Sequence, residues 1–247
     1  MKKLFGLLPL LFLIHFVQAQ ETKTPKVPIG GRPNIPSDLK VEFGFNVLNN
    51  RPADLSTGFF GSRTFNVFYQ HPVSIFGEAS GVTFNPGFGI ATDKLAFNND
   101  ENLFNDPEKG IESSQLIAIS EVYGENIQVN TNTFALSYFE VPLDFTYHFN
   151  KNNYYKGFKL TFGGRVGFLY NAHSKIEFKD ENGLTRKIKD SQNYGFEKIR
   201  YGLSFKAGSP GFYVWSYFGL NRLFQENQGP FDNKAAQISF GIAVNLF

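Results

Sequence analysis

The sequence has no cysteine among its 247 residues. That absence excludes disulfide bridges, cysteine metal sites, thiol catalysis and a lipid anchor attached to cysteine. Long hydrophobic runs are also missing, because no stretch after residue 19 approaches the roughly 18 apolar residues that a membrane-spanning helix needs. Charge of one sign is missing too. With 24 basic and 22 acidic residues, the chain has no excess that would favour nucleic acid or an acidic surface as a partner.

The N-terminus has the features of an export signal. Lys2 and Lys3 precede an apolar stretch over residues 4–16, and a Val-Gln-Ala motif ends at Ala19. We therefore predict a signal peptide over residues 1–19 that is cleaved during export. Residues 20–38 contain four prolines and no periodic pattern, so we predict an extended periplasmic leader there, followed by one domain over residues 39–247.

Aromatic residues are abundant, with 30 Phe, 11 Tyr and 1 Trp, and they alternate with small or polar residues. In FEVPLDFTYHF, residues 139–149, every second residue is large and apolar, while the residues between them include two carboxylates and a histidine. Alternation of this kind predicts β-strands with one apolar face. It occurs in eight segments: 39–48, 63–71, 82–90, 135–150, 158–170, 198–207, 212–223 and 237–247. In the seventh segment both faces are largely apolar.

The connections between these segments alternate between long and short, which is typical of an outer-membrane barrel with short periplasmic turns. Lipid cannot hydrogen-bond an open sheet edge, so a spanning sheet must close. We therefore predict an all-β fold, an eight-stranded antiparallel up-and-down transmembrane β-barrel with a plugged lumen and its apolar face against the bilayer. The alternative is a secreted sandwich or lipocalin-like barrel. That fold would have to bury Phe or Tyr at nearly every inner position.

The polar face of the strands carries charges that we expect inside the barrel. Strand parity places Arg165 opposite or diagonal to Glu140 or Asp144. An eight-stranded barrel has an interior that side chains fill, so we predict a structural ion-pair network, with a proton or ion pathway as the functional alternative. The predicted network consists of Glu140, Asp144, Lys159, Arg165, Lys198 and Arg200.

Two long connections carry most of the remaining charge. The Asn182-Gly183 pair is a strong hairpin signal, so we predict a charged β-ribbon that extends the fifth and sixth strands above the membrane. The connection 91–132 is acidic but lacks the ligand spacing of a known ion-binding loop. It leaves open whether an ion or a protein binds there, and no metal or cofactor is predicted. His173 and Ser174 are adjacent and would point to opposite sides of a strand, so we predict no catalytic residue and no enzymatic activity.

Two motifs, FNPGFGI at residues 84–90 and FEVPL at 139–143, resemble the PorT-like outer membrane β-barrel proteins of Bacteroidetes. The resemblance covers the chain from about residue 30. It implies a non-enzymatic integral barrel in the outer membrane of a Gram-negative bacterium, surrounded by lipid. The founding member is linked to type IX secretion and gliding, which implies a structural or accessory role beside another envelope or secretion-system protein. A small binding or adhesion barrel acting through extracellular loops is the alternative, and a lipid-modifying enzyme is a further one.

Overall fold

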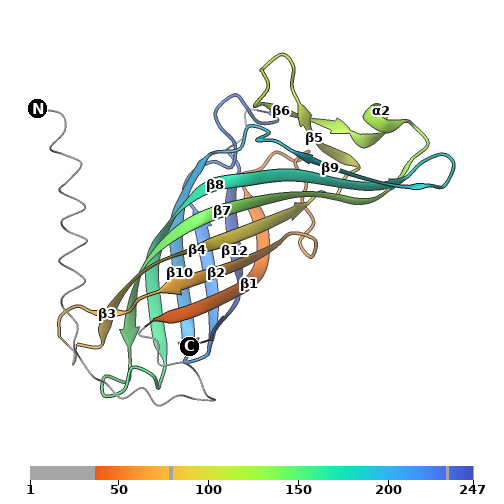
Figure 1. Cartoon of the computed structure of the whole chain (residues 1–247). Coiled ribbons are helices and arrows are strands. Elements are labelled where there is room, and N and C mark those ends of the chain that lie inside the picture. The colour runs from red at the N-terminus through yellow and green to blue at the C-terminus, as the bar shows by residue number, and fades with distance from the viewer. Residues whose placement is uncertain (1–36, 78–79, 232–233, 247) are drawn as a thin grey trace, which may run out of the picture. The chain divides into compact units, whose positions relative to one another are not determined.

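Eight antiparallel strands form a closed barrel in the computed structural model (Figure 1), which describes residues 37–77, 80–231 and 234–246. The predicted signal peptide and nearly all of the predicted leader lie outside the described residues. Each barrel strand pairs with its neighbours along the chain, and pairing of the first strand with the last closes the ring. The predicted eight-stranded up-and-down barrel is therefore confirmed. Its strands are β1 (Asp38–Asn49), β2 (Arg63–Gln70), β4 (Val82–Ala96), β7 (Gln128–His148), β8 (Lys159–Lys179), β10 (Ile199–Ser209), β11 (Phe212–Gly219) and β12 (Ala236–Asn245).

Side chains on the barrel strands alternate between an apolar outer face and a polar inner face. Phe139, Phe145 and Phe162 point outward and are 43%, 49% and 57% exposed, whereas Arg165 is 3% exposed. A soluble barrel would show the opposite arrangement, with its large apolar side chains packed inside. The secreted sandwich or lipocalin-like alternative is therefore wrong.

The sequence did not distinguish the two faces of β11, but in the closed barrel one face points into the lumen and the other points outward. Tyr213, Trp215 and Tyr217 point inward and are buried, and the Trp215 indole donates a 3.0 Å hydrogen bond to the carbonyl of Ile242. Gly44 on β1 makes room for this indole, since a Cβ there would lie 3.0 Å from the Trp215 ring and 2.3 Å from the carbonyl oxygen of Phe240. Glycine on the inner face thus permits aromatic side chains inside a narrow barrel.

Two barrel strands continue far beyond the barrel at the end that carries the long connections. β7 and β8 are each 21 residues long, and β9 (Thr185–Ser191) pairs with the end of β8. We call residues 128–137, 171–179 and 185–191 the ribbon. The predicted hairpin at Asn182-Gly183 is confirmed, because Gly183 has a φ of 75° and Asp180 accepts the Leu184 N–H at 2.9 Å. The predicted ribbon thus exists, but β7, β8 and β9 form it.

The acidic connection that was expected to be a loop contains folded elements. β5 (Glu101–Asn105) and β6 (Ser114–Ala118) form an antiparallel hairpin, followed by the short helix α2 (Ile119–Tyr123). We call these three elements the cap. Ile119 of the cap and Ile176 and Phe178 of the ribbon share one buried cluster, and the rings of Tyr123 and Phe178 stack with centroids 5.3 Å apart. The cap is thereby fixed to one face of the ribbon.

A two-residue strand, β3 (Val73–Ser74), pairs with β4 at the opposite end of the barrel, where the short turns lie. In the parts of the chain that the structure describes, no helix combines the length and the apolar character needed to cross a bilayer.

Candidate functional site

The centre of the lumen holds a charge network that spans the barrel. Arg165 of β8 forms a two-pronged ion pair with Glu42 of β1, with Nη1 to Oε2 at 2.9 Å and Nη2 to Oε1 at 2.8 Å. Lys206 of β10 lies between two carboxylates, 3.2 Å from Glu42 and 2.9 Å from Asp144. The amide of Asn66 also donates to Glu42 at 3.1 Å. Strands on different sides of the barrel are thus joined through its interior.

A second group of charges lies nearer to the end with the long connections. Arg200 of β10 donates from Nε to Glu140 at 2.7 Å and forms an ion pair with Asp93 of β4. Its guanidinium group lies 3.7 Å from the ring centroid of Tyr138, close enough for a cation–π interaction. The pair with Glu140 joins β10 to β7 over Gly167 of the intervening strand β8, and the pair with Asp93 reaches one strand further around the barrel, to β4.

The buried charges of the lumen balance. Burial of an unpaired charge costs several kcal/mol, so paired groups of opposite sign are the arrangement that a closed interior tolerates. A cavity of about 10 Å³ between Asp93, Glu140, Arg165 and Arg200 is about the size of one water molecule, so it is no channel. The buried charged groups of the barrel interior are Glu42, Asp93, Glu140 and Asp144 against Lys40, Arg165, Arg200 and Lys206.

An apolar cluster covers the lumen at the end with the long connections. The rings of Phe134 and Tyr194 meet edge to face at 4.6 Å, and those of Phe196 and Phe224 stack at 4.7 Å. All four side chains are buried in the cluster, together with Leu55 from the connection between β1 and β2. This end of the lumen is therefore closed by packed side chains.

Four of the six residues predicted for the network, Glu140, Asp144, Arg165 and Arg200, lie in the lumen. The predicted position of Arg165 is confirmed, because it lies diagonal to both Glu140 and Asp144 in the pairing of β7 with β8, but its ion pair is with neither of them. Its Cα partners across the sheet are Pro142 and Gly202, which offer no charge. Glu140 pairs with Arg200 and Asp144 pairs with Lys206. The long side chain of Arg165 instead crosses the lumen to Glu42.

The placement of Lys198 in the lumen was wrong. Lys198 precedes β10, is exposed, and forms a 3.1 Å ion pair with Glu112, outside the barrel. Lys159 lies at the short-turn end of β8, opposite His148, and takes part in none of the ion pairs found among the described residues.

Three members of the lumen network were absent from the six residues predicted for it. Glu42 and Lys206 lie on the polar face of their strands, so the parity that selected Arg165 could have included them. Asp93 was assigned to the acidic connection because β4 was predicted to end at residue 90, whereas it continues to Ala96.

The one pair of residues considered for nucleophilic chemistry shows no catalytic geometry. Ser174 is buried, with Oγ 3.2 Å from the Tyr194 hydroxyl, and Tyr194 donates to Asp190 at 2.9 Å. Burial raises the pKa of Tyr194 to about 12, so this phenol stays protonated at neutral pH. His173 points to the opposite face of β8, as predicted, with Nδ1 3.1 Å from the Asn171 side-chain oxygen. Among the residues that the structure describes, no group of three or more potential ligands could hold a metal ion.

A closed barrel that is apolar outside and charged inside, with short turns at one end and long connections at the other, has the architecture of an integral outer-membrane protein. The chain belongs to the outer membrane protein beta-barrel domain family, whose profile matches residues 18–225. It is an outer-membrane β-barrel protein of a Gram-negative envelope. In barrels of this class the short turns face the periplasm and the long connections lie outside the cell.

Comparisons with other known proteins add little beyond this. No curated protein matches the sequence. Among solved structures the chain is similar to Ail, the attachment invasion locus protein of Yersinia pestis, in complex with the heparin analogue sucrose octasulfate. That match has 12% identity and a TM-score of 0.34, and it covers 85% of this chain and 97% of Ail. A mutant of the Rh. blastica porin matches with 10% identity and a TM-score of 0.20, covering 85% of this chain and 99% of the porin.

Proposed function

We propose that this protein is a non-enzymatic accessory component of an envelope assembly, in which the barrel serves as the membrane anchor and the extracellular cap binds a partner protein. The single observation that carries the proposal is the folded cap, because the longest connection of the barrel forms a hairpin and a helix on a sheet that projects from the rim. Ordered connections on a rigid scaffold are where binding residues concentrate.

The lumen supports an anchoring role over a transport role. Paired charges fill its centre, and a packed apolar cluster covers its extracellular end. An eight-stranded barrel has room for side chains but no aqueous channel. A solute would have to displace both layers, and the loss of several buried ion pairs makes that displacement costly.

The cap exposes an apolar side chain where a partner could reach it. Ile111, in the connection between β5 and β6, is 89% exposed, and the acidic residues Glu108 and Glu112 are exposed in the same connection. An apolar side chain surrounded by polar ones matches the apolar core and polar rim of protein interfaces. The partner expected from this surface is a protein with an apolar pocket and basic residues around it.

A detergent pull-down with mass spectrometry tests the proposal. The full protein is extracted mildly from its own membrane and compared with the Ile111→Asp variant and with a periplasmic control, Lys156→Asp. Point variants are preferable to deletion of the cap, because deletion would expose Ile176 and Phe178. We expect one envelope protein to co-purify with the wild type and the control and to be lost from Ile111→Asp.

Two results would contradict the proposal. If the same partner stays bound to Ile111→Asp, binding does not use the cap. If no envelope protein co-purifies with the wild type, the protein is no accessory component, and the alternative of a binding or adhesion barrel that acts alone is favoured. A part in type IX secretion rests on the resemblance to PorT-like proteins, and the identity of the co-purified partner decides it.

A further inference from the structure

The outer face of the ribbon continues the lipid-facing surface of the barrel. On β8 the outward residues are even-numbered within the barrel, as at Phe162, Val166 and Phe168. The pairing of β7 with β8 shifts register between Ser137 and Tyr138, which inserts one extra residue into β8. Beyond this bulge the odd-numbered residues of β8 therefore continue the same surface.

This outer face is basic. It carries four exposed lysines from two strands, and its one acidic residue, Glu177, is already paired with Lys187 at 3.3 Å. Lys175 lies directly opposite Lys189 in the pairing of β8 with β9. Like charges in facing positions destabilise a sheet, so this arrangement indicates an anionic ligand. The four lysines are Lys175, Lys179, Lys187 and Lys189.

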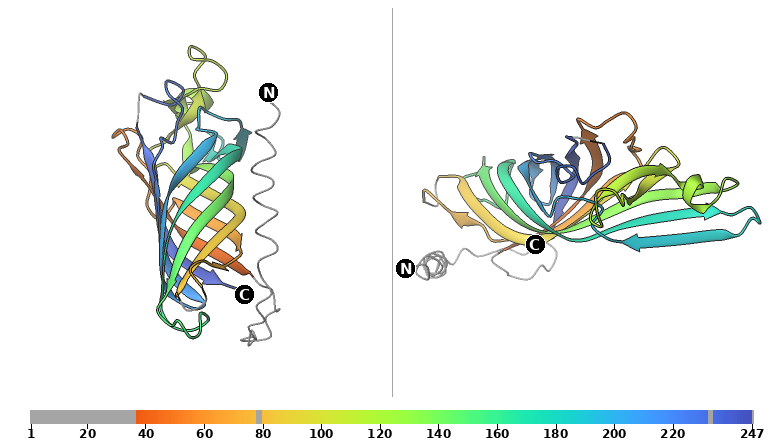
Figure 2. Two further views of the ribbon diagram at one scale, coloured as in Figure 1. Left: turned by 90° about the vertical axis from the view of Figure 1, so that its left-hand side faces the viewer. Right: turned by 90° about the horizontal axis from the view of Figure 1, so that it is seen from above.

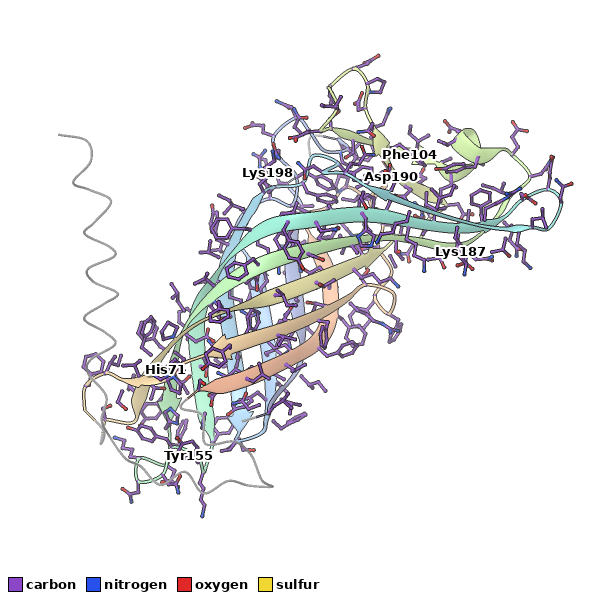
Figure 3. All side chains as sticks on the ribbon, in the orientation of Figure 1. His71, Phe104, Tyr155, Lys187, Asp190 and Lys198 are labelled. Carbon is purple, nitrogen blue, oxygen red and sulfur yellow. The ribbon has the colours of Figure 1, made fainter. Side chains whose placement is uncertain are left out.

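The other face of the ribbon is occupied by the cap, through the cluster of Ile119, Ile176 and Phe178. Figure 3 shows Lys187 on the side of the ribbon away from Phe104 of the cap. Figure 2 shows the ribbon extending sideways well beyond the barrel strands. The lysines therefore lie on the side of this overhang that faces away from the cap and adjoins the apolar exterior of the barrel.

Along this one continuous surface the chemistry changes in the order found at a bilayer boundary. Phenylalanines on the barrel are followed by Tyr170 at the bulge and then by lysines on the ribbon. Aromatic rings are enriched at the level of the headgroups, and basic residues beyond them are attracted to anionic lipid. A lysine also keeps its methylene groups against apolar surface while its ammonium group reaches a phosphate.

We propose that the lysine face of the ribbon lies on the outer leaflet and binds the phosphate groups of its lipids. The ribbon would then have two functional faces, one toward lipid and one that carries the cap away from the membrane. The inference does not depend on the proposed partner protein, since it concerns the opposite face of the ribbon.

Binding of lipid A, a phosphate-bearing lipid, to the full protein immobilised in a zwitterionic detergent tests the charge argument. The variant Lys175→Gln/Lys189→Gln is compared with Lys109→Gln/Lys198→Gln, which removes two extracellular lysines that are paired with Asp106 and Glu112. Each lysine near an anionic lipid surface contributes enough for about a fivefold change, so we expect the first variant to bind about 25-fold more weakly. The second should bind within about twofold of the wild type, and folding of both is checked by gel mobility.

Two results would overturn the proposal. One is equal binding by the two double variants. The other is displacement of lipid A by inorganic phosphate at the same concentration, which would show a site for free phosphate and no docking surface for lipid.

The placement of the ribbon can be measured separately, because the chain has no cysteine of its own. A spin label on Thr185→Cys, opposite Lys179 on the lysine face, is compared with one on Glu121→Cys in α2. In lipid A bilayers that contain a nickel-chelating lipid, we expect stronger relaxation of the label at position 185. Equal relaxation at both positions, or stronger relaxation at position 121, would show that the lysine face does not lie on the leaflet.

Discussion

Replacement of Arg165 tests how strongly the lumen network holds the barrel together. Arg165→Met removes two charge-assisted hydrogen bonds to Glu42, at 2.9 and 2.8 Å, and leaves a carboxylate that is fully buried. Breaking a buried pair in this way typically costs about 3 to 5 kcal/mol. Glu42 keeps Lys206 at 3.2 Å and Asn66 at 3.1 Å, so we expect the lower end, about 3 kcal/mol.

A double-mutant cycle separates the ion pair from simple packing. Glu42→Gln alone leaves Arg165 without its partner and should also cost about 3 kcal/mol. The double variant Arg165→Met/Glu42→Gln removes both charges, so we expect it to cost about 3 rather than about 6 kcal/mol. Val166→Met, on the outer face of the same strand, is the control and should change stability by less than about 0.5 kcal/mol.

Equilibrium unfolding by guanidinium chloride in phospholipid vesicles measures these energies. The fluorescence of Trp215, whose ring lies 5.4 Å from the Arg165 guanidinium, and the gel mobility of the folded barrel give two independent readouts. The reasoning is refuted if Arg165→Met unfolds within about 1 kcal/mol of the wild type, or if the costs of the two single variants add.

Two further predictions concern the inner face of β8 and the ribbon. A Cβ at Gly163 would lie 2.2 Å from Oδ1 of Asp144, whereas a Cβ at Gly164 would meet nothing closer than 3.7 Å. We therefore expect Gly163→Ala to lower the free energy of unfolding by about 1 to 3 kcal/mol in the same assay, and Gly164→Ala to lower it much less. Equal losses of stability in the two variants would contradict this. Burial, and next the nearby Lys189, lower the pKa of His173, so folding favours its neutral form and the ribbon should lose stability as pH falls below about 6.5. Lys189→Gln should raise the pKa of His173 in an NMR titration, and an unchanged pKa would argue against the contribution of Lys189.

The barrel strands could be predicted from the sequence because successive side chains of a strand point to opposite faces, so an apolar outer face and a polar inner face give the sequence a period of two. Phe139, Phe145 and Phe162 point outward for the same reason that Glu140, Asp144 and Arg165 point inward, and neither placement needs long-range information. For β11 the sequence did not show which face points inward, because Tyr213, Trp215 and Tyr217 are as apolar as the outward residues. Only closure of the barrel separates the two faces.

The ion pairs of the lumen could not be predicted, because they depend on distances across the barrel. Strand parity relates Arg165 only to neighbouring strands, while its partner Glu42 lies 123 positions away in the sequence. The error at Lys198 and the omission of Asp93 have a different cause. Alternation weakens at strand ends, so the sequence did not show that β10 begins at Ile199 or that β4 continues to Ala96.

The cap was missed because its elements are too short to produce a pattern. β5, β6 and α2 have five residues each, and a helix of that length is not stable by itself. Packing of Ile119 and Tyr123 on Ile176 and Phe178 stabilises it. These contacts join residues far apart in the sequence, so only an acidic connection could be predicted here.

The central claim is that alternate side chains of the barrel face hydrocarbon while their neighbours face a closed, charged interior. Two pairs of adjacent residues test it in the cysteine-free chain: Phe145→Cys with Thr146→Cys, and Leu203→Cys with Ser204→Cys, where the first residue of each pair is exposed outward and the second is buried in the lumen. A thiol in hydrocarbon stays protonated and is a poor nucleophile, so each folded variant is photolysed in vesicles with a diazirine carried on a lipid acyl chain, which needs no thiolate, and the labelled residue is located by mass spectrometry. The account predicts labelling at positions 145 and 203 and little or none at positions 146 and 204. The reverse pattern, or equal labelling within each pair, would contradict it.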